Sequence, residues 1–470
     1  MPAAREDLRQ LLSLVAIGCA AYANAVFHPF VHDDIVFIAQ NPAIGRLDDI
    51  SAIFFNHSGA PVQGANAYYR PVLELITRLE YRLFGLDPFG YHLFNVLLHA
   101  VNGVLVFFLL SRSGLSRGLA WAASALFLVH PAQTEAVACI AGISNLASAF
   151  FILVCLNFYA SRRYVWALAA FIAGAFTKES AVLLPLVLIG MDRLRAGGSL
   201  RRACARVGPF AAAAGAFLFL RQSLTGANVL SDILASPGEL RLRLLAIPRT
   251  LLTYLKIIVW PDDLHYYRNT DILAPNAWAF AALGIIVLAG FLFFRRLHAD
   301  DRRTAAFGAG WFLLFVLPVL NVLPLINEYS FILTAEHFLY LPIVGILIIG
   351  ALIASRLATS PWIRKGLFAV IFAACVAVTI RQNTFWRGEL PLFERMVRFE
   401  PDFGRGHLLL ANTYYVNRQY ALAQEHYFIA LKIMQGYAFK AQNTTARNVY
   451  LGFIKDIDLD LARLRSKRGQ

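Results

Sequence analysis

The chain has 470 residues, of which 58% are hydrophobic and only 15% are charged. Soluble domains carry roughly 25% charged residues, so the composition indicates a polytopic membrane protein and argues against a soluble enzyme. The formal net charge of +14 does not indicate nucleic-acid binding, because the arginines gather in short segments between apolar runs. That distribution is the positive-inside pattern of membrane proteins.

The first apolar stretch, residues 11–26, follows Arg5 and Arg9. A basic start, an apolar run and small residues near its end are also the features of a signal peptide. The stretch leads directly into a polar segment with two acidic residues. We therefore favour an uncleaved first membrane span over a cleaved leader.

Further apolar runs are long enough to cross about 30 Å of hydrocarbon. They begin near Tyr91, Gly118, Asn145, Arg163, Lys178, Ala203, Ala274, Thr304, His337 and Ile363. With the first span, they predict an all-α polytopic protein of about 11 transmembrane helices over residues 1–381.

Arginine-rich loops fix the predicted orientation. With the N-terminus in the cytoplasm, the clusters at residues 112–117, 162–163, 193–206, 295–303 and 364–365 all lie on the cytoplasmic side, as the charge rule requires. The outer side then holds residues 28–90, 130–131, 177–179, 222–275 and 325–336. We expect the chemistry on that outer side, where these polar segments meet.

Residues 244–260 are apolar enough to form a twelfth span, but Pro248, Arg249 and Lys256 interrupt them. We interpret this segment as an interfacial or re-entrant helix within the outer loop 222–275. Its cations, together with Arg241, either snorkel to the interface or meet lipid phosphate.

The tail, residues 382–470, is predicted to lie on the non-cytoplasmic side as a helical domain. Spacing typical of a tetratricopeptide repeat runs over about 401–435, through Leu410, Ala411, Tyr414, Ala423, Tyr427 and Ala430. Phe393 takes the place of a buried aromatic in the preceding helix, and a further helix is expected over 446–464. A plain helical hairpin is the alternative. Since solenoids generally need three or more repeats, we expect the tail to lean on the membrane domain.

The most informative polar group is His32-Asp33-Asp34, just beyond the first span. Adjacent carboxylates repel each other and are disfavoured near hydrocarbon, so stability alone does not explain them. In an extended segment, neighbouring side chains point in opposite directions. One Asp is then a candidate general base toward an acceptor hydroxyl, and the other a structural hydrogen-bond acceptor. A solvated loop turn is the alternative.

Two outer cations are candidates for binding phosphate. Arg70 offers a planar fork suited to phosphate, or it pairs with Glu74 or Glu80. Lys178 stands at an outer turn where the charge rule disfavours lysine, and either a bound anion or a salt bridge to Glu179 or Glu135 explains it.

Four polar residues of the second span share one helix face, namely His92, Asn95, His99 and Asn102. Hydrogen bonding between helices is the preferred interpretation for the last three. His92, nearest the outer surface, is the functional candidate. His130 and Glu135 at the end of the third span, with Glu328, Glu336 and His337, complete the outer rim.

The chain shows neither zinc-ligand spacing of His and Cys nor a glycine-rich phosphate loop. No cofactor is therefore required and no metal site is indicated, although an adjacent Asp pair could bind a divalent metal. A soluble nucleotide substrate is not expected.

Taken together, the chain resembles the transmembrane and tetratricopeptide-repeat-containing O-mannosyltransferases and their bacterial relatives, within the C superfamily (GT-C) of glycosyltransferases. The resemblance covers nearly the whole chain in order. It is carried by Phe30-Val31-His32-Asp33-Asp34, Asn41-Pro42, Tyr69-Arg70-Pro71, Phe89-Gly90-Tyr91-His92 with Asn95 and His99, His130-Pro131 with Glu135-Ala136-Val137, Lys178-Glu179, and residues 335–342 from Ala335 to Pro342.

This resemblance implies a membrane glycosyltransferase that takes a sugar from a polyprenyl-phosphate donor, usually with inversion at the anomeric carbon. Its acceptor would be a protein, a lipid or a glycan on the non-cytoplasmic face. Asp33 maps as the catalytic base with Asp34 beside it, and Glu135 as an acceptor contact, to which we add His92. Arg70 and Lys178 are donor-phosphate candidates. We place His337 with them, although relatives often have Arg there.

Two other classes remain as alternatives. A transporter or flippase favours internal repeats and charges at the membrane midplane, whereas here the carboxylates gather at one surface. A non-catalytic scaffold would use only the repeat tail. The short tail favours a cell inner membrane over the endoplasmic reticulum membrane.

Overall fold

The computed structural model describes residues 2–46, 50–55, 69–196, 200–225, 237–268, 276–320, 334–357, 360–440 and 444–468. In these ranges the chain is helical or irregular, and β-structure is limited to bridge residues at Arg268 and Thr334. The chain divides into two compact units. Unit 1 comprises residues 1–264 and 271–384, and unit 2 comprises residues 265–270 and 385–470.

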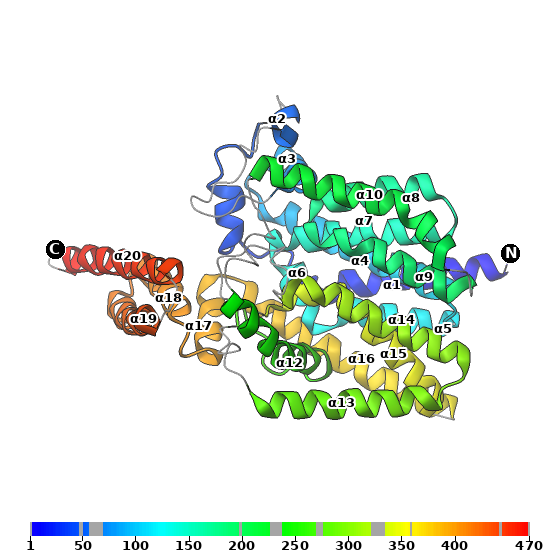
Figure 1. Cartoon of the computed structure of the whole chain (residues 1–470). Coiled ribbons are helices and arrows are strands. Elements are labelled where there is room, and N and C mark those ends of the chain that lie inside the picture. The colour runs from blue at the N-terminus through cyan, green and yellow to red at the C-terminus, as the bar shows by residue number, and fades with distance from the viewer. Residues whose placement is uncertain are drawn as a thin grey trace. The chain divides into compact units, whose positions relative to one another are not determined.

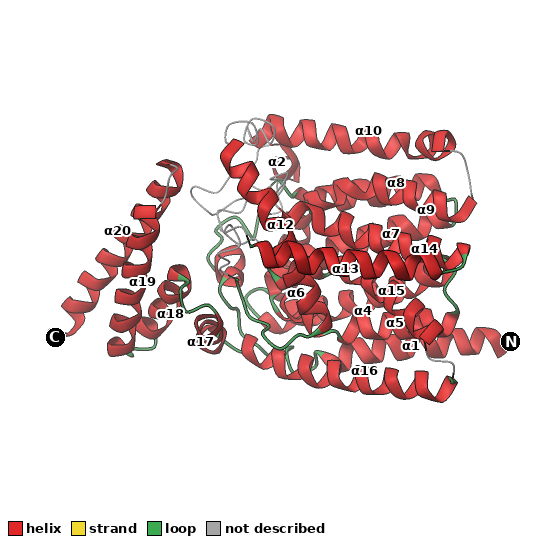
Figure 2. Cartoon of the chain, turned by 60° about the horizontal axis from the view of Figure 1, so that its bottom comes forward, coloured by secondary structure: helices red, strands yellow, loops and turns green. Residues whose placement is uncertain are grey.

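Long helices make up most of unit 1 and lie side by side, roughly parallel or antiparallel to one another (Figures 1 and 2). They are α1 (Pro2–Ala21), α4 (Pro88–Arg112), α5 (Arg117–Val129), α7 (Ile143–Ala160), α8 (Tyr164–Thr177), α9 (Leu184–Ala196), α10 (Leu200–Thr225), α13 (Ala277–Arg296), α14 (Ala299–Val316), α15 (Pro342–Leu357) and α16 (Pro361–Asn383). In a helix the backbone N–H and C=O groups bond to one another, which is required in a bilayer because lipid tails offer them no hydrogen-bond partners.

Each apolar run that the sequence predicts as a span coincides with one of these helices. Six helical segments of the described chain are long and apolar enough to cross a membrane. They are Pro88–Arg112, Ile140–Ala160, Leu200–Thr225, Ala277–Arg296, Ala299–Leu320 and Pro361–Trp386. Shorter apolar helices cover Arg117–Val129, Tyr164–Thr177 and Pro342–Arg356. A multi-pass membrane protein is therefore confirmed, whereas the number of 11 crossings stays a prediction.

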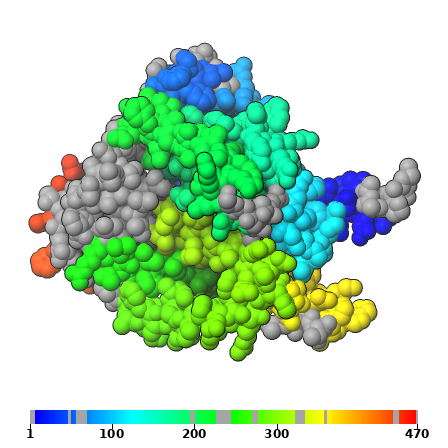
Figure 3. Space-filling model, turned by 45° about the vertical axis from the view of Figure 1, so that its right-hand side comes forward, coloured from blue at the N-terminus to red at the C-terminus, as the bar shows by residue number. Residues whose placement is uncertain are grey.

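Helix α13 lies on the outside of unit 1, in the yellow-green lower part of Figure 3. Large apolar side chains such as Ile285 and Val287 are 68% and 61% exposed. An apolar surface of this kind is costly in water and ordinary against lipid tails, which fits a helix at the edge of a bundle in a bilayer.

Short elements gather at the end of the bundle away from Pro2 (Figure 1). They are η1 (Ile35–Ala39), α2 (Ile50–Phe55), α3 (Pro71–Phe84), η2 (Pro131–Gln133), α6 (Thr134–Ala138), η3 (Ile140–Gly142), η4 (Glu179–Leu183), η6 (Leu317–Leu320) and η7 (Glu336–Leu339). Residues 28–90 are expected from the sequence only as a loop, so the helical η1, α2 and α3 within them are a finding of the structure.

Helix α12 (Pro237–Val259) contains the segment predicted to lie at the interface, with Pro248 inside it. It is not among the six candidate spans, and its placement as an interfacial or re-entrant helix stays a prediction. Lys256 lies 2.9 Å from Asp263 and 3.3 Å from Asp262. Local carboxylates therefore hold this cation.

The polar face of α4 makes the contacts between segments that its spacing predicts. Asn95 donates to the carbonyl oxygens of Cys139 and Ile140 at 3.1 and 3.3 Å. His99 lies 2.7 Å from the Tyr340 hydroxyl, to which Asn102 also donates at 3.1 Å. Both residues are fully buried. The preferred interpretation for these three residues is confirmed.

Unit 2 holds η8 (Thr384–Trp386) at its boundary with unit 1, and then α17 (Glu389–Phe399), α18 (Gly404–Val416), α19 (Tyr420–Lys440) and α20 (Thr444–Arg468). The predicted core positions Phe393, Leu410, Ala411, Tyr414, Ala423, Tyr427 and Ala430 are all buried. The helical tail is thus confirmed. Its identity as a tetratricopeptide repeat, its side of the membrane and its docking on the membrane domain stay predictions.

Candidate active site

Asp33 and Asp34 lie in different environments. Asp34 is 1% exposed, and its carboxylate accepts hydrogen bonds from the Ala141 N–H at 2.7 Å and the Val31 N–H at 3.1 Å. The Cys139 thiol lies 3.5 Å from the same oxygen that Ala141 contacts. The side chain of Asp33 is 36% exposed, and His32 Nε2 lies 3.4 Å from it. Asp34 therefore ties the first loop to η3, while Asp33 faces outward.

The sequence suggested an extended segment here, and that expectation is wrong. Asp33 and Asp34 begin a helical turn that continues as η1. His32, just before them, has φ of 49°, in the left-handed region that few side chains adopt. The two carboxylates point in different directions because consecutive side chains of a helical turn are rotated relative to each other, not because of strand alternation.

Burial also separates the two carboxylates electrostatically. Burial raises the pKa of Asp34 to about 7, against the two backbone N–H groups, which lower it, and the charge of Asp33 raises it further. Asp34 thus holds its proton more tightly than an ordinary carboxyl. Asp34 is therefore poorly suited to act as a general base at neutral pH.

Glu135 of α6 and His337 of η7 are joined by two hydrogen bonds. The His337 backbone N–H donates to Glu135 Oε2 at 2.9 Å, and its ring Nδ1 lies 2.7 Å from Oε1. Burial would raise the pKa of Glu135, but the charge and hydrogen bonds of His337 outweigh it and lower that pKa. The sequence places Glu135 at the acceptor substrate and His337 at the donor phosphate, whereas in the structure the two residues bind each other.

Lys178 lies at the junction of α8 and η4 and is 6% exposed. Its Nζ donates to Asn145 Oδ1 at 2.7 Å and lies 5.6 Å from the centre of the Phe338 ring, next to His337. The position of an ammonium over an aromatic face is favourable. This contact brings η4 and η7 together.

Arg70 forms a bidentate ion pair with Glu179. Its Nε and Nη2 atoms lie 2.9 and 2.6 Å from the two Glu179 oxygens. Burial would raise the pKa of Glu179, but Arg70, Arg221 and Lys178 lower it to about 2. The alternative that Arg70 pairs with a carboxylate is thus confirmed, but with Glu179 and not with a local residue such as Glu74, which pairs with Arg78.

These contacts connect four segments that are distant in the sequence, namely residues 28–90, 131–142, 178–183 and 336–339. Asp34 joins the first loop to η3, the Glu135–His337 pair joins α6 to η7, Lys178 joins η4 to η7, and Arg70 joins the start of α3 to η4. The acidic and basic candidates therefore gather at one end of unit 1, away from the arginine clusters.

His92 is 1% exposed in the first turn of α4, and its ring meets that of His28 edge-on with 6.1 Å between centroids. This packing fits a residue that fixes the loop on α4. His130, also buried, bonds the Ile258 carbonyl at 2.9 Å, and burial lowers its pKa to about 4. Glu328 lies outside the described residues.

Within the described ranges, no three His, Cys, Asp or Glu side chains are arranged to hold a metal ion. Asp34 in particular already receives two backbone N–H groups. These donors suit a carboxylate with a structural role better than one that coordinates a cation.

Comparison with known proteins adds the evolutionary relationship. No protein-family model matches the chain. A protein O-mannosyl-transferase of Caenorhabditis elegans is 25% identical over 449 residues, which cover 92% of this chain and 64% of that protein. Protein O-mannosyl-transferase TMTC3 of Homo sapiens is 26% identical over 441 residues, 82% of this chain and 47% of that one. The chain is a homologue of the protein O-mannosyltransferases.

The relationship has two further features. A protein O-mannosyl-transferase of Drosophila melanogaster, Tmtc1, is 40% identical over 147 residues, 30% of this chain and 17% of that protein. The chain spans 64% and 47% of the lengths of the Caenorhabditis and human relatives, so this homologue matches only part of each.

Solved structures give more distant matches. An oligosaccharyltransferase of Archaeoglobus fulgidus with a tethered acceptor peptide aligns with a TM-score of 0.43 and 11% identity over 81% of this chain and 55% of that chain. ArnT from Cupriavidus metallidurans, bound to undecaprenyl phosphate, aligns with a TM-score of 0.37 and 15% identity over 92% and 81% of the two chains.

Sequence reasoning about this homologue missed how its residues are paired. Glu179 lies 109 positions from Arg70, and Glu135 lies 202 positions from His337. Neither separation carries a local signal. Cys139, which contacts Asp34, gave no signal either, because it lies in an apolar segment that predicts packing.

Proposed function

We propose that the protein is a GT-C-type membrane glycosyltransferase, which moves a sugar from a polyprenyl-phosphate donor to a hydroxyl acceptor on the non-cytoplasmic face. The observation that carries the proposal is the partly exposed Asp33 carboxylate, held beside buried Asp34 at the end of unit 1 where Lys178 and the Glu135–His337 pair also lie. Homology to protein O-mannosyl-transferases supports sugar transfer.

In the proposed step, Asp33 accepts the proton of the acceptor hydroxyl, and the oxygen of that hydroxyl attacks the anomeric carbon of the donor sugar. The bond from that carbon to the phosphate oxygen breaks, and the polyprenyl phosphate leaves with the bonding electrons. One positioned carboxylate suffices as base. Attack from the face opposite the phosphate inverts the anomeric centre.

Cations near the leaving group stabilise the charge that it gains. We assign this role to Lys178, whose Nζ lies over the Phe338 ring. His337 is a second donor-phosphate contact, because Glu135 holds its backbone N–H and its Nδ1 and so fixes the orientation of the ring. Its Nε2 is the atom that would meet the phosphate.

Arg70 and Glu135 take positioning roles in this proposal. Arg70 is committed to Glu179 through two hydrogen bonds, so it acts by holding η4 and therefore Lys178. Both Glu135 oxygens accept from His337, so Glu135 orients that ring and is not assigned to the acceptor. His92, buried against His28, is not assigned to the acceptor either.

The acceptor is a hydroxyl of a protein or glycan, and the proposed roles require no metal ion. The arginine clusters at the other end of unit 1 support the assignment to the non-cytoplasmic face. The geometry serves equally in a cell inner membrane, as the sequence suggests, or in an endoplasmic reticulum membrane.

The test is sugar transfer by the purified protein from a polyprenyl-phosphate mannose donor to a serine- or threonine-containing peptide. Asp33→Asn removes the base and should lower the transfer rate by about 100-fold or more, with the melting temperature unchanged. Asp300→Asn is the matched control, since the Asp300 side chain is 95% exposed at the arginine-rich end.

Transfer by Asp33→Asn at the unmutated rate would refute Asp33 as the base. Absence of transfer by the unmutated protein with a panel of polyprenyl-phosphate sugars would instead favour the flippase or scaffold classes. A lipid-scrambling assay in vesicles separates those two.

A further inference from the structure

A groove lies between α9 and α14, with a volume of about 520 Å³. Ligand pockets commonly measure about 300–1,000 Å³. Two helices line it, through Leu186, Val187, Gly190 and Arg193 of α9 and Arg303, Ala306, Phe307, Gly310, Trp311 and Leu314 of α14. We call it the α9–α14 groove. None of these residues belongs to the candidate active site.

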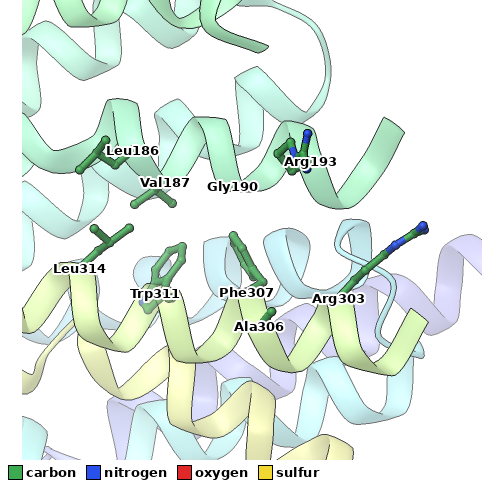
Figure 4. A pocket seen from close by; sticks show the side chains of 10 residues that line it. Leu186, Val187, Gly190, Arg193, Arg303, Ala306, Phe307, Trp311 and Leu314 are labelled. Carbon is green, nitrogen blue, oxygen red and sulfur yellow. The ribbon is translucent and has the colours of Figure 1, made fainter. Parts of the chain in front are cut away.

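The groove is apolar along its length and basic at one end. Val187, Phe307 and Trp311 are buried and form its floor, whereas Leu186, which is 48% exposed, and the half-buried Leu314 form its rims. Figure 4 shows Leu186 and Val187 facing Leu314 and Trp311, with Arg193 and Arg303 together at the other end.

Two glycines keep the groove open. A Cβ atom at Gly310 would meet nothing within 4 Å, and one at Gly190 would meet only Phe307, at 3.9 Å. Trp311 is held in the floor because its indole N–H donates to the Leu341 carbonyl at 2.8 Å. The groove is therefore bounded by side chains with fixed positions.

Two carboxylates that lie close to these arginines in the sequence have other partners. Asp192 accepts from Arg206 at 3.1 Å and from the Tyr159 hydroxyl at 2.9 Å, and Asp301 pairs with Arg356.

In the part of the chain that the structure describes, Arg303 pairs with Asp300, at 3.6 Å. Both of these side chains are largely exposed, and such exposed pairs contribute little. The end of the groove marked by Arg193 and Arg303 thus keeps net positive charge.

We infer that the α9–α14 groove binds one anionic phospholipid of the surrounding leaflet, with an acyl chain along the apolar floor and the phosphate at Arg193 and Arg303. Basic pockets between membrane helices on the cytoplasmic side suit acidic lipid head groups. The site lies at the arginine-rich end of unit 1, opposite Asp33. It is therefore a second lipid site, separate from the proposed donor site.

The floor residue Trp311 provides the readout. The protein is reconstituted in phosphatidylcholine vesicles, and phosphatidylglycerol with brominated acyl chains is titrated in. Bromine quenches indole fluorescence on contact. Occupancy of the groove is measured as the saturable part of the quenching that the unmutated protein shows and the Trp311→Phe variant does not. Brominated phosphatidylcholine should give no such saturable component.

Two variants separate head group from chain. The double variant Arg193→Gln, Arg303→Gln should weaken phosphatidylglycerol binding by about tenfold or more. Its matched control is Arg364→Gln with Lys365→Gln, at the start of α16. Gly310→Leu should abolish quenching by filling the groove, and Gly284→Leu on α13, where a Cβ also meets nothing within 4 Å, should leave quenching unchanged.

Three outcomes would overturn the inference. They are equal quenching by brominated phosphatidylcholine, unchanged binding in the double arginine variant, or displacement by polyprenyl phosphate at lower concentration than by phosphatidylglycerol. The last result would assign the groove to the carrier lipid of the donor instead. Both arginines are exposed, so the double variant should fold and the measurement stays decisive.

Discussion

At the residue scale, Asp33 and Asp34 show what one sequence can and cannot reveal. A pair of carboxylates beyond the first span predicts that they divide two tasks, but not which residue takes which. That choice depends on the backbone N–H of Ala141, which lies 107 positions along the chain. The structure therefore adds the different surroundings of the two carboxylates, which their spacing in the sequence alone does not reveal.

The two aspartates should differ in their effect on stability. Asp34→Ala removes the acceptor of the buried Val31 N–H and of the half-buried Ala141 N–H, and should cost about 1.5–3 kcal/mol of unfolding free energy. Asp33→Ala alters a partly exposed side chain and should stay within about 0.5 kcal/mol. Denaturant unfolding in detergent measures both. Equal losses would contradict the structural role of Asp34.

Glu80 gives a prediction about pH. It is 4% exposed, and burial raises its pKa from 4.5 to about 8. Between these values the folded protein keeps a proton that the unfolded chain releases, so the stability contributed by Glu80 falls as the pH rises through this window. Neither of its oxygens has a hydrogen-bond partner in the described structure.

Glu80→Gln cannot ionise and should therefore be more stable than the unmutated protein at pH 8, by more than about 1 kcal/mol. The difference should shrink toward pH 5. Melting temperatures at the two pH values test this, with Glu74→Gln as the control in the same helix. A constant difference across the range would show that Glu80 is ionised in the folded protein.

At the element scale, hydrophobic runs predicted the long helices but not how closely they approach. Gly308 of α14 and Gly345 of α15 face each other so tightly that a Cβ at Gly345 would lie 2.3 Å from the Gly308 carbonyl oxygen. Small residues at membrane helix crossings permit this approach. Nothing local in either run marks the two glycines as partners.

Gly345→Ala should therefore push α14 and α15 apart and lower the unfolding free energy by about 1–3 kcal/mol. Gly350→Ala, on the same helix, meets nothing within 4 Å and should be neutral or slightly stabilising, since alanine is the better helix former. Thermal melts of both variants in one detergent provide the measurement. A neutral Gly345→Ala would contradict the close crossing.

The short elements were the least predictable from sequence. Helix α3 begins at Pro71, where proline suits a first helical turn, yet it lies in a segment expected as loop. Helix α6 and η3 are too short for a periodic pattern. These two short elements carry Glu135 and the Asp34 partner Ala141. The sequence therefore predicts least about the part of the chain that forms the candidate site.

At the scale of the whole molecule, charge distribution was the most informative signal. Alternation of arginine clusters along the chain predicted that the polar groups of distant loops share one side. The contacts of Asp34 with η3, of α6 with η7 and of Lys178 with η7 within unit 1 fit that arrangement. The pairing inside the site depends on three-dimensional packing, which one sequence does not encode in any local pattern.

The central claim is that Asp33 and Lys178 flank the scissile bond of a polyprenyl-phosphate sugar. A structure of the protein with a bound, non-hydrolysable polyprenyl-phosphonate sugar tests it most directly. The expected result has the phosphonate within hydrogen-bonding distance of Lys178 Nζ and the anomeric carbon facing the Asp33 carboxylate. A phosphonate seated instead at Arg193 and Arg303, with no sugar near Asp33, would contradict the claim.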